Sequence, residues 1–169
     1  MAMSANAQRI LKLAHIITAC SWLGGNFALL IISFVRLNID DGRVLLGVNI
    51  AGMWVDYIVV IALGALGCLI TGLIYSLGTA WGFFKHKWVI AKWILTIAMI
   101  VYGISFLGPS KTEMLALNKE LLDAVLTSTR YKEVEMMHLL GSPLQIIGLI
   151  ISVIISIYKP WRKKSIPNN

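Results

Sequence analysis

The stretch "AGMWVDYIVVIALGALGCLITGLIYSLG", residues 51–78, decides the fold class of this chain. Asp56 is its only charged residue, and a helix needs about 20 apolar residues to cross the hydrocarbon core of a bilayer. Three further stretches are predominantly apolar, at residues 9–35, 89–107 and 142–158. Together they predict an all-α integral membrane protein, a four-helix bundle that forms one membrane domain over residues 1–169.

The composition supports this class. Hydrophobic residues make up 58% of the chain and charged residues 14%, whereas a soluble domain has about 25% charged residues. We find no phosphate-binding glycine loop, nucleophile elbow or zinc-ligand spacing, which excludes the soluble enzymes that carry them. The net charge of +7 is explained by membrane topology and by contact with anionic lipid, without a nucleic-acid partner.

The segment 108–141 links the third and fourth spans. Gly108-Pro109 is predicted to end the third span. Pro143 is predicted to lie at the start of the fourth span, where the absence of its N–H group costs no helical hydrogen bond. Residues 110–113 have capping-box spacing, and apolar residues recur after them at helical intervals. This pattern predicts an extracytoplasmic amphipathic helix between spans 3 and 4, lying at the interface or over the bundle mouth.

Lysine and arginine residues predict the orientation, because short loops rich in them stay in the cytoplasm. With four spans, the two termini and the 79–88 loop share one side. That side carries no acidic residue, and every acidic residue outside the spans lies on the other side. We therefore expect a multi-pass protein of the cell (inner, cytoplasmic) membrane with both termini in the cytoplasm.

Ionisable residues inside spans are costly and are candidates for a functional site. His15 and Lys92 both lie about 5 Å below the inner boundary at 1.5 Å rise per residue, so they are level with each other. Asp56 lies near the outer boundary, where a salt bridge with Arg43 or Arg36 is expected. His15 either binds a ligand or hydrogen-bonds to a neighbouring helix. Lys92 either contacts a ligand or anchors the helix at the interface.

Trp22 lies seven residues after His15, on roughly the same face of the first helix, and Gly24 follows it. Small residues allow close approach of helix backbones, and they can also leave room for a flat ligand. The three residues therefore suit either a porphyrin slot or ordinary helix packing.

Three stretches carry a family resemblance: "LKLAHIITACSWLGGNFAL" (11–29), "WVIAKWILTIAMIVYG" (88–103) and "SPLQIIGLIISVIISIYKPW" (142–161). They resemble helices of the HemJ-type protoporphyrinogen oxidases, whose relatives include the DUF2269 membrane proteins and, more distantly, the CopD-like copper-resistance proteins. In that pattern a helix carries His followed by Trp and Gly, a Trp-x-x-x-Lys helix comes later, and the last helix closes in Lys-Pro-aromatic. The matching residues are His15, Trp22, Gly24, Trp88, Lys92, Lys159, Pro160 and Trp161.

The resemblance implies an oxidoreductase-type protein that binds haem b or a porphyrin between its helices. His15 would ligate the haem iron, with Trp22 and Gly24 beside the cofactor. Lys92 would pair with a propionate or act in catalysis. Electrons would pass to a membrane quinone or a cytochrome. Where the family pattern has Tyr-His this chain has Tyr102-Gly103, so a DUF2269-like relative describes it better than a HemJ oxidase.

Two other classes of function stay open at this point. A metal-handling or transport accessory protein is one, because Met136, Met137 and His138 offer soft ligands for copper on the outer side. Consecutive residues of a helix point in different directions, however, which favours ordinary interface packing for these three. The other is a structural or assembly subunit of a membrane complex without a cofactor. A homo-oligomer is compatible with each class.

Overall fold

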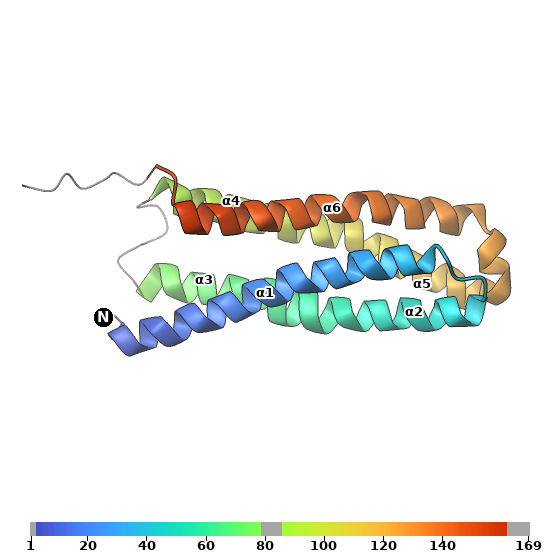
Figure 1. The fold of residues 1–169 in the computed structure, drawn as a ribbon, viewed down its shortest axis with the longest axis horizontal. Helices are drawn as coiled ribbons and strands as arrows, with labels where there is room; N and C mark the ends of the chain where they lie inside the picture. Colours follow the sequence, from blue (N-terminus) through green and yellow to red (C-terminus); the bar gives the residue numbers. More distant parts are fainter. Residues whose placement is uncertain (1–2, 79–85, 162–169) are drawn as a thin grey trace, which may run out of the picture.

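The computed structural model describes residues 3–78 and 86–161, and every regular element within these ranges is helical. The chain runs up and down as a bundle of four long helices (Figure 1). The first is α1 (Ala5–Arg36), and the fourth is α6 (Thr129–Tyr158). The second comprises α2 (Gly42–Trp54), the π-helix η1 (Val55–Leu66) and α3 (Gly67–Gly78). The third comprises α4 (Lys87–Tyr102), the π-helix η2 (Gly103–Leu107), α5 (Gly108–Leu121) and the 3₁₀-helix η3 (Leu122–Thr127). The expectation of an all-α bundle with four long apolar helices is confirmed.

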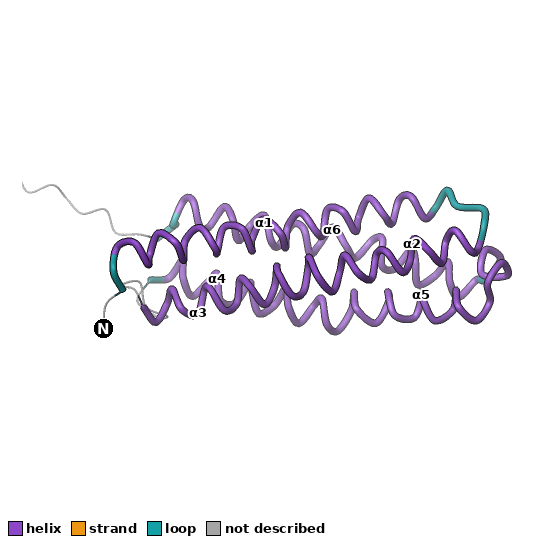
Figure 2. Tube along the Cα trace, turned by 90° about the horizontal axis from the view of Figure 1, so that it is seen from below, coloured by secondary structure: helices purple, strands orange, loops and turns teal. Residues whose placement is uncertain are grey.

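The bundle has two unlike ends, which Figures 1 and 2 show at opposite sides of the molecule. At the first, here called the terminal end, lie the beginnings of α1 and α4 and the ends of α3 and α6. At the second, here called the hairpin end, lie the turn at residues 37–41 and η3, which leads α5 into α6.

Each of the four long helices is apolar enough to cross a membrane. The shortest, α6, has 30 residues. At 1.5 Å per residue it is about 45 Å long, whereas the hydrocarbon core of a bilayer is about 30 Å thick. A bilayer would therefore leave about 15 Å or more of the bundle outside its apolar core. The helices extend beyond the predicted spans chiefly at the hairpin end, where α2 begins at Gly42 and α6 at Thr129.

Residues 108–141 differ from the expectation of a separate amphipathic helix. Gly108-Pro109 does not end the third helix, because α5 continues directly from η2. In a regular α-helix the ring of Pro109 would collide with the carbonyl of Ser105. The π-helix η2 ends at Leu107, two residues before this proline, and π-helical turns are one of the departures from regular geometry found where a helix bends. The segment consequently extends the bundle, with α5 packed against α2 and α6.

Pro143 also differs from expectation, because it lies inside α6 and not at its start. The helix begins at Thr129, where the Ser128 Oγ accepts a hydrogen bond from the Tyr131 N–H at 3.2 Å. This N-cap starts the helix well before the proline. The fourth helix therefore includes residues that the sequence assigned to the outer segment.

Two apolar cores hold the bundle together. The central core lies between the middle parts of the four helices and consists of Trp22, Leu29, Val60, Cys68, Met99 and Leu149. The hairpin core closes the other end and consists of Leu45, Met114, Val125, Tyr131 and Val134.

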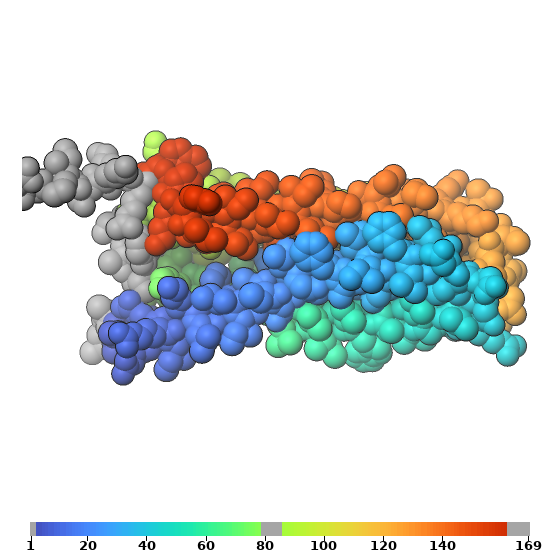
Figure 3. Space-filling model, in the orientation of Figure 1, coloured from blue at the N-terminus to red at the C-terminus, as the bar shows by residue number. Residues whose placement is uncertain are grey.

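The terminal end is less closely packed than the hairpin end. α1 packs on η1 and α3, and α4 packs on α6, but α3 and α4 have only marginal contact with each other. A hydrogen bond of 3.3 Å from Trp93 Nε1 to Ser76 Oγ joins these two helices. Figure 3 shows a hollow between α1 and α6 toward the terminal end. The two helix pairs thus diverge where His15 and Lys92 are located.

Candidate functional site

His15 faces α3, where its Nδ1 lies 2.7 Å from Thr71 Oγ1. The same hydroxyl lies 2.6 Å from the carbonyl oxygen of Gly67, which can only accept. Since a hydroxyl has one proton, Thr71 donates to Gly67 and accepts from His15 Nδ1. In the neutral imidazole Nε2 then carries the lone pair, and this is the nitrogen that could ligate a metal. The hydrogen bond to a neighbouring helix, one of the two expectations for His15, is therefore present.

Lys92 is brought close to His15, as the depth argument predicted. It comes from α4, is half-buried, and interacts electrostatically with both His15 and Cys68. Within residues 3–78 and 86–161 it has no ion pair. All 8 acidic residues of the chain lie at or after Asp40 and at or before Glu135, on segments of the hairpin half. No acidic side chain of the described residues therefore neutralises Lys92.

Trp22 and Gly24 are not brought together with His15. Trp22 is only 4% exposed and packs on η1, where a Cβ at Gly64 would lie 2.7 Å from Trp22 Cα. Gly24 is exposed, and no atom lies within 4 Å of the place where its Cβ would stand. Gly25, the next residue, faces Val60 instead. The small residues here serve backbone contact between α1 and η1.

A second ligand for a metal at His15 is not evident. Among the described residues no group of three or more His, Cys, Asp or Glu side chains could hold a metal ion. Met99 of α4 packs its Sδ on Gly148 of α6 within the central core. Within the part of the chain that the structure describes, no cluster of three such ligands therefore surrounds His15.

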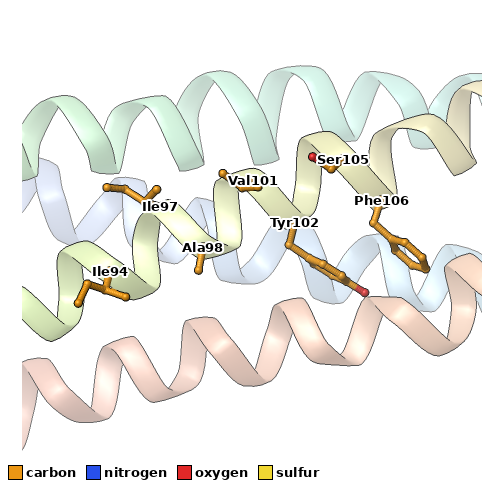
Figure 4. Close-up of a pocket in the computed structure, with 7 residues that line it drawn as sticks. All are labelled: Ile94, Ile97, Ala98, Val101, Tyr102, Ser105 and Phe106. Carbon is orange, nitrogen blue, oxygen red and sulfur yellow. The ribbon is translucent and has the colours of Figure 1, made fainter.

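A wide groove lies on the outward face of α4 and η2 (Figure 4). Its volume is about 620 Å³, and apolar side chains from Ile94 to Phe106 form nearly all of its surface. Tyr102 borders it and donates a hydrogen bond to the carbonyl oxygen of Gly141 at 3.0 Å. No acidic, basic or histidine side chain lines the groove, so it suits contact with lipid rather than chemistry.

A second cluster of polar side chains lies in the hairpin half and joins all four long helices. We call it the polar network. It includes two ion pairs: Arg36 Nε lies 3.5 Å from Glu135 Oε1, and Lys111 Nζ lies 2.5 Å from Asp56 Oδ2. All four side chains are at most 10% exposed. Asp56 therefore forms the salt bridge expected of it, but its partner is Lys111 and neither Arg43 nor Arg36.

Hydrogen bonds complete the network. Arg36 donates from Nη2 to Ser33 Oγ at 2.9 Å and from Nη1 to Asn49 Oδ1 at 3.3 Å. Asn49 Nδ2 in turn lies 3.0 Å from Asn118 Oδ1 and 3.1 Å from Tyr131 Oη, and the Asn118 amide donates to the backbone carbonyl of Gly42. Buried polar groups need such partners, because an unmade hydrogen bond in the interior is costly. Each of the four long helices contributes at least one partner.

His138 belongs to this network, and the methionines beside it do not. Its ring is 2% exposed, with Nδ1 at 3.5 Å from both Ser33 Oγ and Ser142 Oγ. Met136 and Met137 are 46% and 49% exposed and point away from the bundle. The structure does not bring the three residues together as one set of ligands.

The sequence signals located part of the network. Asp56 and His138 stood out as ionisable residues near the outer boundary, but Lys111, Asn49, Asn118 and Glu135 were not recognised as buried. They lie in segments predicted to be outside the spans, where polar residues are ordinarily solvated. No signal in the linear sequence indicates that a bundle core extends into this region.

No family model, no curated protein and no solved structure matches this chain. The resemblance to HemJ-type proteins accordingly stays a prediction that rests on short motifs.

Proposed function

We propose that this protein is a multi-pass membrane protein that binds haem b, or a porphyrin of similar shape and charge, at its terminal end for a redox role. His15 would ligate the iron through Nε2, and Lys92 would face a carboxylate of the ligand. The hollow between the helix pairs α1–α3 and α4–α6 is the place for it. The quinone or cytochrome partner and the inner-membrane location belong to the same proposal.

The observation that carries this proposal is that Lys92 is half-buried and has no acidic partner among the described residues. An ammonium group held among apolar helices costs free energy unless an anion accompanies it. In the described bundle all acidic side chains belong to the hairpin half, so the described residues supply no anion at this depth. A ligand that carries carboxylates would supply it. A histidine with one nitrogen held by Thr71 lies beside the same lysine.

The residues present fit one side of a haem. The hydrogen bond to Thr71 holds the imidazole in the tautomer that a haem ligand requires, and it fixes the orientation of the ring. Bound haem would supply one-electron redox chemistry, at a potential that apolar surroundings and the single imidazole would tune. The role of this chain is to hold the group and exclude water. Trp22 does not line the site, because Gly64 closes the space beside it.

An absorbance spectrum tests the proposal. Detergent-purified protein, titrated with haem, is expected to develop a Soret band and to show reduced and oxidised forms. His15→Ala should abolish the band, whereas the control His86→Ala, at the same end of the bundle, should retain it. Lys92→Met should weaken haem binding more than the matched change Lys12→Met, which removes an exposed lysine of α1.

The proposal would be contradicted by a folded protein that develops no Soret band with haem, or by a Soret band that His15→Ala leaves unchanged. A structural or assembly subunit would then be the better description. Copper handling gains no support from the geometry, since the exposed methionines and the buried His138 do not converge.

A further inference from the structure

The outward face of α4 is the least covered surface of the four long helices. In the third long helix 6% of the most apolar stretch is buried, against 17% or 28% in the others. The groove on this face has a volume of about 620 Å³ and is lined by residues from Ile94 to Phe106 (Figure 4). Tyr102 borders the side of the groove that faces α6, where it bonds to Gly141. The groove is therefore an apolar channel that follows the helix axis.

Lys87, the first residue of α4, lies on the same face as this groove. Residues seven and eleven positions apart fall within about 20° of each other on a helix of 3.6 residues per turn, so Lys87, Ile94 and Ala98 form one line. At 1.5 Å per residue, Lys87 lies about 10 Å from Ile94, toward the terminal end. Its side chain is exposed and has no ion pair in the described part of the chain. The apolar groove is thus headed by a cation.

A second ammonium group lies close by, where the end of α6 packs beside the beginning of α4 (Figure 1). The Nζ of Lys159, the residue after α6, is 5.8 Å from the ring centroid of Trp88, which directly follows Lys87. This cation–π contact holds the Lys159 ammonium group near the start of α4. Tyr158 and Trp161 beside it are 77% and 65% exposed, as aromatic residues at a membrane–water boundary often are.

The charges of the terminal end and the length of the groove indicate what fits this surface. All acidic residues of the chain lie between Asp40 and Glu135, on segments of the hairpin half, so the two lysines attract an anion. The groove below them attracts an apolar chain. An acyl chain whose headgroup lies at Lys87 would pass Ile94 and reach Ala98 at a depth of about 16 Å. Half of the hydrocarbon core is about 15 Å thick, which is the depth that such a chain spans.

We propose that the beginning of α4 and the end of α6 bind one anionic phospholipid of the leaflet at the terminal end. Its negative headgroup lies against Lys87 and Lys159, and one acyl chain lies in the groove at Ile94 and Ala98. The lysines select an anionic headgroup over a zwitterionic one, and the groove selects a lipid over a free anion. The site uses neither His15 nor Lys92, so it is independent of the haem proposal.

Native mass spectrometry gives the direct test. The full chain, in detergent micelles that contain equal amounts of phosphatidylglycerol and phosphatidylcholine, is expected to retain one phosphatidylglycerol in preference to phosphatidylcholine. Phosphatidylglycerol should also raise the unfolding temperature more than phosphatidylcholine does. Glycerol phosphate, which carries the anionic group without acyl chains, should leave the unfolding temperature unchanged at the same concentration.

Matched variants separate this site from a general effect of charge. Lys87→Gln should weaken phosphatidylglycerol binding by about fivefold, the contribution of one lysine near an anionic surface. Lys12→Gln removes an exposed lysine of α1 at the same end and should leave binding unchanged. Ala98→Phe fills the groove without a change of charge and should weaken retention of the lipid.

Three results would overturn the proposal: equal retention of the two lipids, equal stabilisation by glycerol phosphate and phosphatidylglycerol, or equal losses in Lys87→Gln and Lys12→Gln. Wild-type binding of phosphatidylglycerol by Ala98→Phe would overturn the placement of the acyl chain in the groove.

Discussion

At the scale of single residues, two glycines of neighbouring helices show what the tertiary structure requires of a small side chain. Gly64 lies against the backbone of Trp22, with only 2.7 Å between the position of a Cβ and Trp22 Cα. Backbone atoms cannot move aside as the end of a flexible side chain can. Gly24, which the sequence placed beside a cofactor, faces open space. Glycine is therefore required by packing at position 64, whereas position 24 has room for a larger side chain.

Gly64→Ala should destabilise the bundle by about 1–3 kcal/mol, because the added methyl group forces α1 and η1 apart. Gly24→Ala should be neutral or stabilising by about 0.5–1 kcal/mol, since alanine loses less conformational freedom in a helix than glycine does. Unfolding in detergent, followed by circular dichroism, compares the two variants. Equal effects would show that α1 and η1 are not in backbone contact at Trp22.

At the scale of elements, side chains outside the helices decide where helices begin. Asp41 ends the turn after α1 and caps α2: its Oδ1 accepts hydrogen bonds from the Val44 N–H at 2.9 Å and the Arg43 N–H at 2.7 Å. Ser128 caps α6 in the same way. These caps explain why both helices begin before the predicted spans. Hydropathy identifies the apolar part of a helix, and it does not indicate the polar turns that precede that part.

The cap at Asp41 predicts a pH dependence. The hydrogen bonds from the backbone of Val44 and Arg43 lower the pKa of Asp41 below its ordinary value. A carboxylate with a lowered pKa stabilises the folded state above its ordinary pKa, and the contribution is lost as the pH falls through the pKa of the folded protein. Asp41→Ala should therefore be less stable than the wild type at neutral pH, and the difference should shrink from about pH 4 downward. Unfolding temperatures measured between pH 7 and pH 3 check this. A difference that is constant over this range would mean that the charge of Asp41 contributes nothing to the cap.

At the scale of the whole molecule, charge is distributed along the bundle axis. The acidic residues belong to the hairpin half, where Glu113, Glu120, Asp123 and Glu133 accompany the buried pairs. The described part of the terminal end has only cationic side chains among its charged residues: Arg9, Lys12, Lys87, Lys92 and Lys159. Such an asymmetry favours a cytoplasmic terminal end. The hairpin end, with its polar network and hairpin core, would extend beyond the membrane on the other side.

Labelling of single cysteines tests this orientation. With Cys20 and Cys68 replaced by alanine, Glu120→Cys should react with a membrane-impermeant maleimide applied to intact cells. Lys12→Cys should react only after the membrane is permeabilised. Reversed labelling would place the termini outside, and labelling of both positions in intact cells would argue against a membrane-spanning bundle.

The candidate sites were predictable to different degrees. The linear spacing placed His15 and Lys92 at one depth, because each lies a fixed number of residues from a charged helix end and helices have a constant rise. In the structure the two residues interact electrostatically. The slot of Trp22 and Gly24 was not predictable in the same way, since the rotation of one helix against another decides which face of α1 is covered.

By itself, the sequence determined the four apolar helices, the polarity of charge between the two ends and the positions of the ionisable residues along each helix. These properties depend on residue type and position along one helix. Only the tertiary structure decided which side chains meet: Ser33 and His138 lie 105 residues apart in sequence, yet their side chains are 3.5 Å apart. The physical reason is that burial creates the need for a partner, and the packing of the helices decides which partner is within reach.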